Sequence, residues 1–117
     1  MSLNDMTARE LARALKNREV SAVEVTENTL ERAERVGKQV GAFAHLTPEL
    51  ARDQAANADR AIAAGDAPAF AGVPVPIKDL NLVAGQPWEA GSRVMAGNVA
   101  QGNDAIVDLL ASAGTVC

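Results

Sequence analysis

The chain has 117 residues, of which 48% are hydrophobic and 22% charged, and its formal net charge is −4. This composition is typical of a globular protein and excludes a disordered chain, and the acidic balance argues against a nucleic-acid-binding surface. The single cysteine, Cys117, excludes an internal disulfide framework, and no apolar run reaches the roughly 20 residues that span a bilayer. We therefore expect one domain at most, cytoplasmic and without a membrane partner.

Two helices are predicted near the start of the chain, each by a capping box. Thr7 and Ser21 are each followed three residues later by a Glu, the spacing at which the two residues satisfy each other's backbone N–H groups. The first helix is expected to run to about Asn17. The second is expected to end at Gly37, where a glycine would form a left-handed cap.

A third helix is predicted from Thr47, a cap residue followed by proline at the first helical position, to a stop near Gly65. Residues 1–66 thus form an N-terminal helical region that holds 20 of the 26 charged side chains. Residues 67–117 are charge-poor and rich in Val, Gly and Pro, which is typical of a chain whose surfaces are mostly covered. We interpret this second part as the start of a buried α/β region.

Residues 73–78 alternate between apolar and other side chains, which predicts a strand. Its two prolines cannot donate to a neighbouring strand, so it is at best an edge strand. After a long Gly/Asn-rich loop at 79–103, Asn103 caps a further helix that ends at Gly114, and residues 115–117 begin another strand. The expected fold class is α/β, with N-terminal helices packed on the beginning of a mixed β-sheet.

One segment of the second part resembles the lysine motif of the amidase signature family, G-[VI]-P-x-x-[IV]-K-D, and it reads Gly72-Val73-Pro74-Val75-Pro76-Ile77-Lys78-Asp79-Leu80. Residues 84–92 are similar to that family's A-G-x-P-x-x-x-G-S segment, and residues 104–114 to its D-A-x-V-x-x-L-x-x-A-G helix. The resemblance implies an incomplete part of a larger amidase-type fold. Residues 67–117 would then hold the catalytic-lysine strand, the long loop and a helix of the catalytic core.

The resemblance also implies a chemistry. The family hydrolyses or transfers amide groups through a Ser–Ser–Lys triad, and Lys78 matches its catalytic lysine. The two serines belong to a Gly/Ser-rich segment that is expected beyond Cys117, and none of the four serines of this chain lies in such a segment. We therefore expect the chain alone to hold the base of an active site without its nucleophile, and to be inactive.

The residues around Lys78 give a physical reason for this role. A lysine removes a proton only while it is neutral, and burial disfavours its charged form. Lys78 follows the apolar run Val73–Ile77 in the charge-poor part, so we expect it to be desolvated, with Asp79 sent to the other face by strand alternation. Without the motif, a lysine at a strand end is more often a surface residue that extends into solvent.

Other side chains have structural explanations. His45 has no second ligand at metal spacing and the glycines form no phosphate-binding pattern, so we expect no metal and no cofactor. Trp88 and Met95 are candidates for a substrate pocket or for the core. Arg93 is expected in an inward-facing ion pair, and Cys117 is interpreted as an ordinary strand residue.

The leading interpretation is an amidase that hydrolyses the carboxamide C–N bond of a small-molecule substrate, with Lys78 as general base. A sister interpretation is a transamidase like the amidase-family subunit of glutamyl-tRNA amidotransferase, which feeds ammonia to misacylated tRNA and would add a nucleic-acid partner. Residues 81–87 resemble the general amidases more. The third interpretation is a truncated, non-catalytic fragment, and the amphipathic N-terminal helices make a homodimer a further hypothesis.

Overall fold

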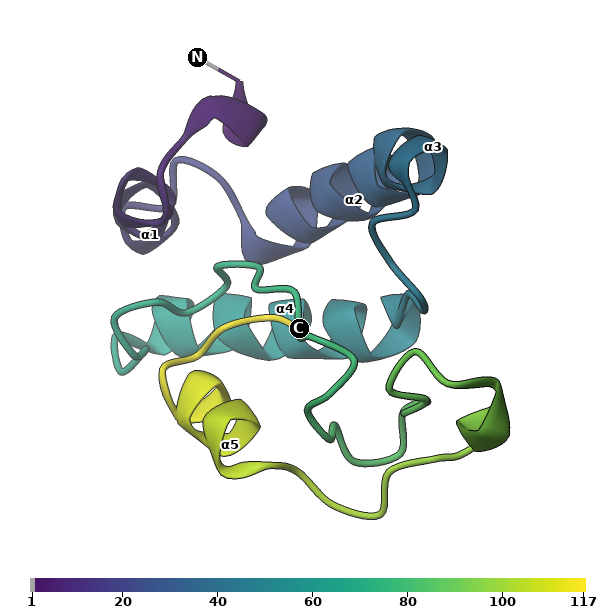
Figure 1. Ribbon diagram of the computed structural model, residues 1–117. Coiled ribbons are helices and arrows are strands. Elements are labelled where there is room, and N and C mark those ends of the chain that lie inside the picture. Colours follow the sequence, from purple (N-terminus) through teal and green to yellow (C-terminus); the bar gives the residue numbers. More distant parts are fainter. Residues whose placement is uncertain (1) are drawn as a thin grey trace.

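The computed structural model describes residues 2–117, which form helices joined by turns and one long irregular segment. In chain order the elements are the 3-10 turn η1 (Leu3–Asp5), α1 (Ala8–Lys16), α2 (Ala22–Arg32), the π-helical turn η2 (Ala33–Gly37), α3 (Lys38–Val40), α4 (Pro48–Ala64), the 3-10 turn η3 (Arg93–Met95) and α5 (Ala105–Ser112). Figure 1 shows α4 in the middle, with α1 and α2 on one side and α5 on the other. No helix of residues 2–117 has the length and apolar character needed to cross a membrane.

Both predicted capping boxes are present. The Thr7 N–H donates to the Glu10 carboxylate at 2.8 Å, and the Glu10 N–H donates to the Thr7 hydroxyl at 3.3 Å. Ser21 and Glu24 exchange the same two bonds at 2.9 and 3.1 Å. The starts of α1 and α2 are therefore confirmed, and local side-chain chemistry is enough to define them.

The predicted end of the second helix is wrong. Gly37 has a φ of −57° and lies inside a continuous helical stretch, and the left-handed residue is Gly41, with a φ of +62°. The structure gives Gly37 a packing role instead, because a Cβ there would lie 3.0 Å from the ring of Phe43. Glycine is needed at this position for close approach and not for its backbone freedom.

The third predicted helix is confirmed as α4, and Gly65 follows it with a φ of +80°. Its inner face is made of Ala51, Ala55 and Ala58, all buried, and small side chains let α4 approach α2 closely. Asp59 ties the two helices together, because its carboxylate accepts the N–H groups of Ala22 at 2.7 Å and of the next residue at 3.1 Å.

The expected mixed β-sheet is wrong. Residues 2–117 contain only two isolated bridges, a parallel one between Pro74 and Val116 and an antiparallel one between Pro87 and Val99. Around the parallel bridge, the Val75 N–H donates to Val116 at 2.7 Å and the Val116 N–H donates to Val73 at 2.9 Å. Pairing stops there because proline has no N–H to donate and no further described strand lies alongside. Along the chain α5 lies between Pro74 and Val116, but the structure assigns neither residue to a strand.

One hydrophobic core contains residues from both predicted parts of the chain. The boundary between residues 66 and 67 stays a prediction. The core residues are Leu11, Leu15, Ala22, Val25, Ala51, Ala55, Ala58, Ala71, Val73 and Val116. Gly72 lies at the contact between the parts with a φ of +83°, and a Cβ on it would meet the Ala22 Cβ at 2.7 Å. The helical part and the Lys78 segment therefore meet at a position that only glycine fits.

The fit at Gly72 predicts an unequal response to alanine at two glycines of similar conformation. Gly65→Ala forces an alanine to a φ of +80° in open space, whereas Gly72→Ala adds the contact with Ala22 at 2.7 Å. We expect losses of unfolding free energy of about 1 kcal/mol for Gly65→Ala and about 2–4 kcal/mol for Gly72→Ala. Urea denaturation followed by circular dichroism measures both, and equal losses would contradict the packing explanation.

Candidate active site

The segment that carries Lys78 runs from a buried start to an exposed end. Val73 is 4% exposed, Val75 and Ile77 are half-buried, and Lys78 is exposed. Within the described chain the Lys78 amino group forms no ion pair. The expected desolvation of Lys78 is therefore not found, because backbone pairing with Val116 ends at Val75 and nothing described covers the end of the segment.

Asp79 is half-buried and lies in a turn, not in a strand, and its carboxylate faces the long loop. Its Oδ1 accepts the N–H of Glu89 at 3.2 Å and its Oδ2 accepts the N–H of Gly91 at 3.4 Å. The carboxylate next to the candidate base thus holds the far side of the long loop. Bonds of this kind, from an N–H to an ionised acceptor, are stronger than neutral ones.

Glu89, whose N–H is bound by Asp79, uses its own carboxylate to contact Gly97 and His45. Its Oε1 accepts the N–H of Gly97 at 2.9 Å, and its Oε2 lies 3.2 Å from the Nε2 of His45. The Gly97 N–H and then His45 hold the pKa of the Glu89 carboxyl below its usual value. His45 therefore has the structural role expected for it, since it links the segment before α4 to the loop.

Asp104 and Asn103 fix the loop at its other end. The Asp104 carboxylate accepts the Leu82 N–H at 2.9 Å and the Asp104 N–H returns a bond to the Leu82 carbonyl at 3.0 Å, while Asn103 accepts the Ala84 N–H at 2.8 Å. The prediction that Asn103 caps the last helix is wrong by one residue, because Asp104 is the N-cap of α5. The side chains of Asn103 and Asp104 thus accept N–H groups of the loop and not the first N–H groups of α5.

The remaining candidate residues lie around this loop. Trp88 is half-buried and its indole N–H donates to the Leu80 carbonyl at 3.2 Å, and Met95 is half-buried in η3. The inward-facing ion pair expected for Arg93 is wrong, because Arg93 is exposed and unpaired within residues 2–117. Cys117 follows the bridged residue Val116 and belongs to no strand, and its N–H donates to the Gln54 Oε1 at 2.8 Å.

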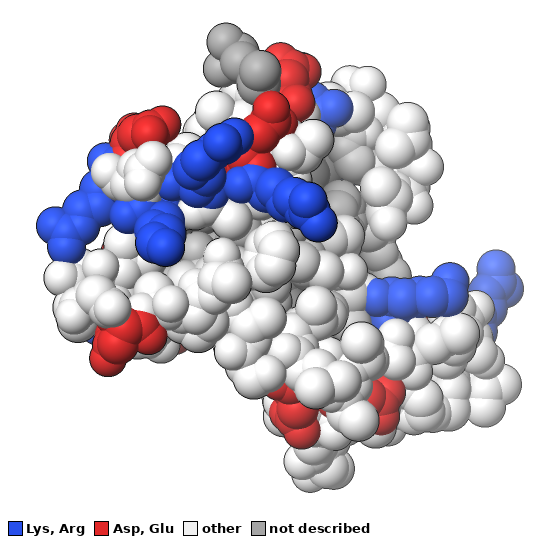
Figure 2. Space-filling view, turned by 90° about the vertical axis from the view of Figure 1, so that its left-hand side faces the viewer, with Lys and Arg blue, Asp and Glu red and all other residues white. Residues whose placement is uncertain are grey.

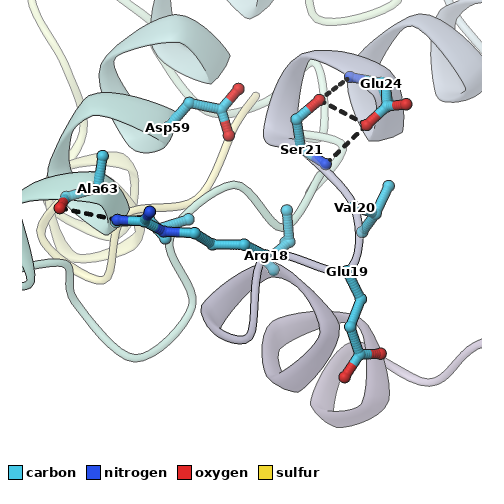
Figure 3. Close-up of a pocket in the computed structure, with 9 residues that line it drawn as sticks. Arg18, Glu19, Val20, Ser21, Glu24, Asp59 and Ala63 are labelled. Carbon is cyan, nitrogen blue, oxygen red and sulfur yellow. Dashed lines mark hydrogen bonds between the residues drawn. The ribbon is translucent and has the colours of Figure 1, made fainter.

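Of two cavities in the described chain, the smaller one adjoins the Lys78 segment at Ile77. It has a volume of about 200 Å³ and is lined mainly by apolar side chains, among them Ile77, Val107 and Leu110. The larger one, of about 390 Å³, lies where α1, α2 and α4 meet. Figure 3 shows two of its polar residues already engaged, with Arg18 bonded to the Ala63 carbonyl and Ser21 to Glu24. We therefore place the candidate site at Lys78.

Several large apolar side chains that follow Lys78 in the sequence are exposed. In Figure 2, Lys, Arg, Asp and Glu side chains gather over the upper part of the face, where α1 lies, and few lie over the lower part, where α5 lies. Exposed fractions are 58% for Leu80, 92% for Val94 and 65% for Leu109. These three side chains belong to different segments, the turn after Lys78, η3 and α5, and each leaves apolar surface uncovered in the described chain.

Comparison with known proteins defines the class to which this fold and motif belong. The sequence model of the Amidase family matches residues 24–117. The chain therefore belongs to the amidase family.

Individual relatives agree with this assignment. A glutamyl-tRNA(Gln) amidotransferase subunit from Dinoroseobacter shibae is 41% identical over 114 residues, covering 97% of this chain and 23% of the relative. The corresponding subunit from a Geobacter species is 45% identical over 95 residues, covering 81% of this chain and 20% of the relative. The chain thus spans less than a quarter of the length of these relatives.

A solved structure shows the same fold. Peptide amidase from Stenotrophomonas maltophilia superimposes with a TM-score of 0.88 at 24% sequence identity, covering 96% of this chain and 23% of that chain. The arrangement of helices and of the Lys78 segment is therefore that of part of an amidase fold.

Sequence reasoning missed the acidic residues that shape the loop. Residues 67–117 hold four acidic side chains, and Asp79, Glu89 and Asp104 each accept backbone N–H groups. A signal was present in the sequence, because carboxylates that recur in a charge-poor, glycine-rich segment need donors and the unpaired backbone of such a segment supplies them.

The lowered pKa of Glu89 predicts a pH-dependent contribution to stability. A carboxyl whose folded pKa is depressed stabilises the fold above its unfolded pKa, and this stabilisation is lost as the pH falls through the folded pKa. Glu89→Gln removes this titration. We expect the gap in unfolding free energy between the wild type and Glu89→Gln to shrink as the pH falls from about 6 to about 3.

Urea denaturation at a series of pH values measures this gap. Glu31→Gln, at an exposed position of α2, is the matched control. A gap for Glu89→Gln that does not change with pH would show that the Glu89 charge contributes nothing to the folded loop.

Proposed function

We propose that this chain supplies the general base of an amidase, which hydrolyses the carboxamide C–N bond of a small-molecule substrate, and that Lys78 is this base. The observation that carries the proposal is the lysine motif at residues 72–80, inside the part of the chain that matches the Amidase family. The position of Lys78 supports it. The amino group lies at the free end of a segment anchored in the core, where another group can reach it.

The proposed chemistry follows from what an amide requires. A serine hydroxyl attacks the carbonyl carbon only when its proton is removed, and a neutral lysine takes that proton through a second, bridging serine. The amine leaves with a proton, and water then hydrolyses the acyl-serine, while backbone N–H groups stabilise the oxyanion. In this proposal the surface around Lys78 is covered in the active protein, because burial disfavours the charged form of a lysine.

The serines of this chain support a nucleophile from elsewhere. Ser21 and Ser92 accept N–H groups of Glu24 and Val94, Ser2 accepts the Asn4 N–H, and Ser112 donates to the Leu109 carbonyl. Each serine hydroxyl within residues 2–117 is therefore used by a turn or a helix end near it in the sequence. We propose that the 117-residue chain alone does not hydrolyse amides.

A second candidate function is transamidation. The relatives named as glutamyl-tRNA(Gln) amidotransferase subunits match 81–97% of this chain at 41–45% identity, and this identity favours the transamidase. Such a protein would release ammonia from an amide donor for use on misacylated tRNA, so a nucleic acid would be a partner of the complex. Both candidates use the same base. They differ in the fate of the ammonia, which the amidase releases and the transamidase passes to misacylated tRNA.

Substitution of Lys78 tests the shared chemistry. The test uses the polypeptide encoded by the complete reading frame that contains this chain, with ammonia release from a carboxamide as the assay. We expect Lys78→Ala to lower kcat/KM by about 10²–10⁴-fold, the range that general base catalysis contributes. Lys38→Ala, at an exposed lysine of α3, is the matched control and is expected to retain activity.

Three outcomes discriminate among the proposals. Activity of Lys78→Ala close to that of the wild type would remove Lys78 from the mechanism. Amide hydrolysis by the purified 117-residue chain would show that the nucleophile lies within it. A strict requirement for misacylated tRNA during ammonia release would replace the free amidase by the transamidase.

A further inference from the structure

The turn from Glu89 to Ser92 has an unfavourable conformation for its sequence. The Ser92 N–H donates to the Glu89 carbonyl at 2.8 Å, which closes a four-residue turn. Its central residues, Ala90 and Gly91, have φ values of +50° and +67°. Positive φ at both central positions is the pattern of a type I′ turn, which favours Asn, Asp or Gly. Alanine at the first of these positions is strained, so another interaction must stabilise the turn.

Asp79 supplies that interaction. Its two carboxylate oxygens accept the N–H groups of Glu89 and Gly91, which flank the strained Ala90, at 3.2 and 3.4 Å. The two bonds bring the N–H groups on either side of Ala90 onto one carboxylate, which holds the chain in its turned conformation there. The negative charge of Asp79 therefore stabilises the conformation that Ala90 disfavours.

The same contacts fix the backbone from which Lys78 extends. The Asn81 N–H donates to the Lys78 carbonyl at 2.9 Å, and the indole N–H of Trp88 donates to the Leu80 carbonyl at 3.2 Å. Asp79 and Trp88 thus join the short turn that begins at Lys78 to the turn that begins at Glu89. Because the Lys78 side chain is exposed, the direction in which it leaves the backbone depends on these main-chain contacts.

We propose that Asp79 is a positioning residue for Lys78, and that it acts by holding the strained Glu89–Ser92 turn against the backbone of residues 78–81. This inference rests on the proposed function of Lys78 as the base. Asp79 takes no part in proton transfer, and its carboxylate faces the loop. If this is so, a substitution that removes the strain at Ala90 should compensate in part for the loss of the Asp79 carboxylate.

Amide hydrogen exchange of Ser92 in the 117-residue chain tests the structural half of the proposal. The Ser92 N–H closes the turn and does not touch Asp79, so its exchange rate reports whether the turn is formed. We expect Asp79→Asn to accelerate this exchange about tenfold. The added substitution Ala90→Gly removes the strain and is expected to return the rate to within about threefold of the wild type. Asp53→Asn, at an exposed position of α4, is the control and should leave the rate unchanged.

The kinetics of amide hydrolysis by the polypeptide of the complete reading frame test the functional half. We expect Asp79→Asn to lower kcat about tenfold with little change in KM, and Ala90→Gly in the same background to recover most of the loss. General destabilisation would not produce this recovery, because Ala90 lies on the loop surface and supports no core residue.

The outcomes separate this inference from the proposed function. Loss of activity in Lys78→Ala together with full activity in Asp79→Asn would overturn the positioning role alone. An unchanged Ser92 exchange rate in Asp79→Asn, or no recovery with Ala90→Gly, would also overturn it. Full activity in Lys78→Ala would overturn the proposed function, while the Ser92 exchange rate would still decide whether Asp79 holds the turn.

Discussion

The close parallel approach of residues 72–75 to residues 114–116 is the constraint on which the rest of this structure depends. The Gly72 N–H donates to the Gly114 carbonyl at 2.9 Å, and a Cβ at Gly114 would lie 2.8 Å from the Cα of Ala71. Both glycines have φ values above +80°, so the contact requires glycine on each side. This contact places α5 beside the core and packs residues 67–117 against the N-terminal helices (Figure 1). It also fixes the start of the segment that ends at Lys78.

Beyond this contact the chain is organised by carboxylates. Asp59 accepts the first N–H groups of α2, and Asp79, Glu89 and Asp104 accept N–H groups of a loop that has almost no regular structure. An unpaired backbone needs acceptors, and a few ionised side chains provide strong ones without any β-sheet. This loop lies within the part of the chain that matches the Amidase family, and it directly follows the candidate base Lys78. The apolar surface around α5 is left uncovered next to it.

Features encoded by neighbouring residues could be predicted from the sequence, and features that depend on distant partners could not. The capping boxes at Thr7 and Ser21 are local pairs of side chains, and they were predicted correctly. Gly37 was assigned a backbone role because the ring of Phe43, which packs against it, is not apparent from local patterns. The mixed sheet and the burial of Lys78 were inferred from an apolar, alternating segment. Such a pattern predicts neighbouring segments that pair with the strand and cover it, whereas the described residues provide only the short pairing with Val116.

In our proposal Lys78 becomes the base of an amidase site once its surroundings are complete. The most direct test is a crystal structure of the polypeptide of the complete reading frame with a slowly hydrolysed carboxamide bound. We predict that the Lys78 Nζ is buried there and lies about 3 Å from a serine hydroxyl, within reach for proton transfer. An Nζ that remains in solvent, with no hydroxyl in hydrogen-bond range, would contradict this role.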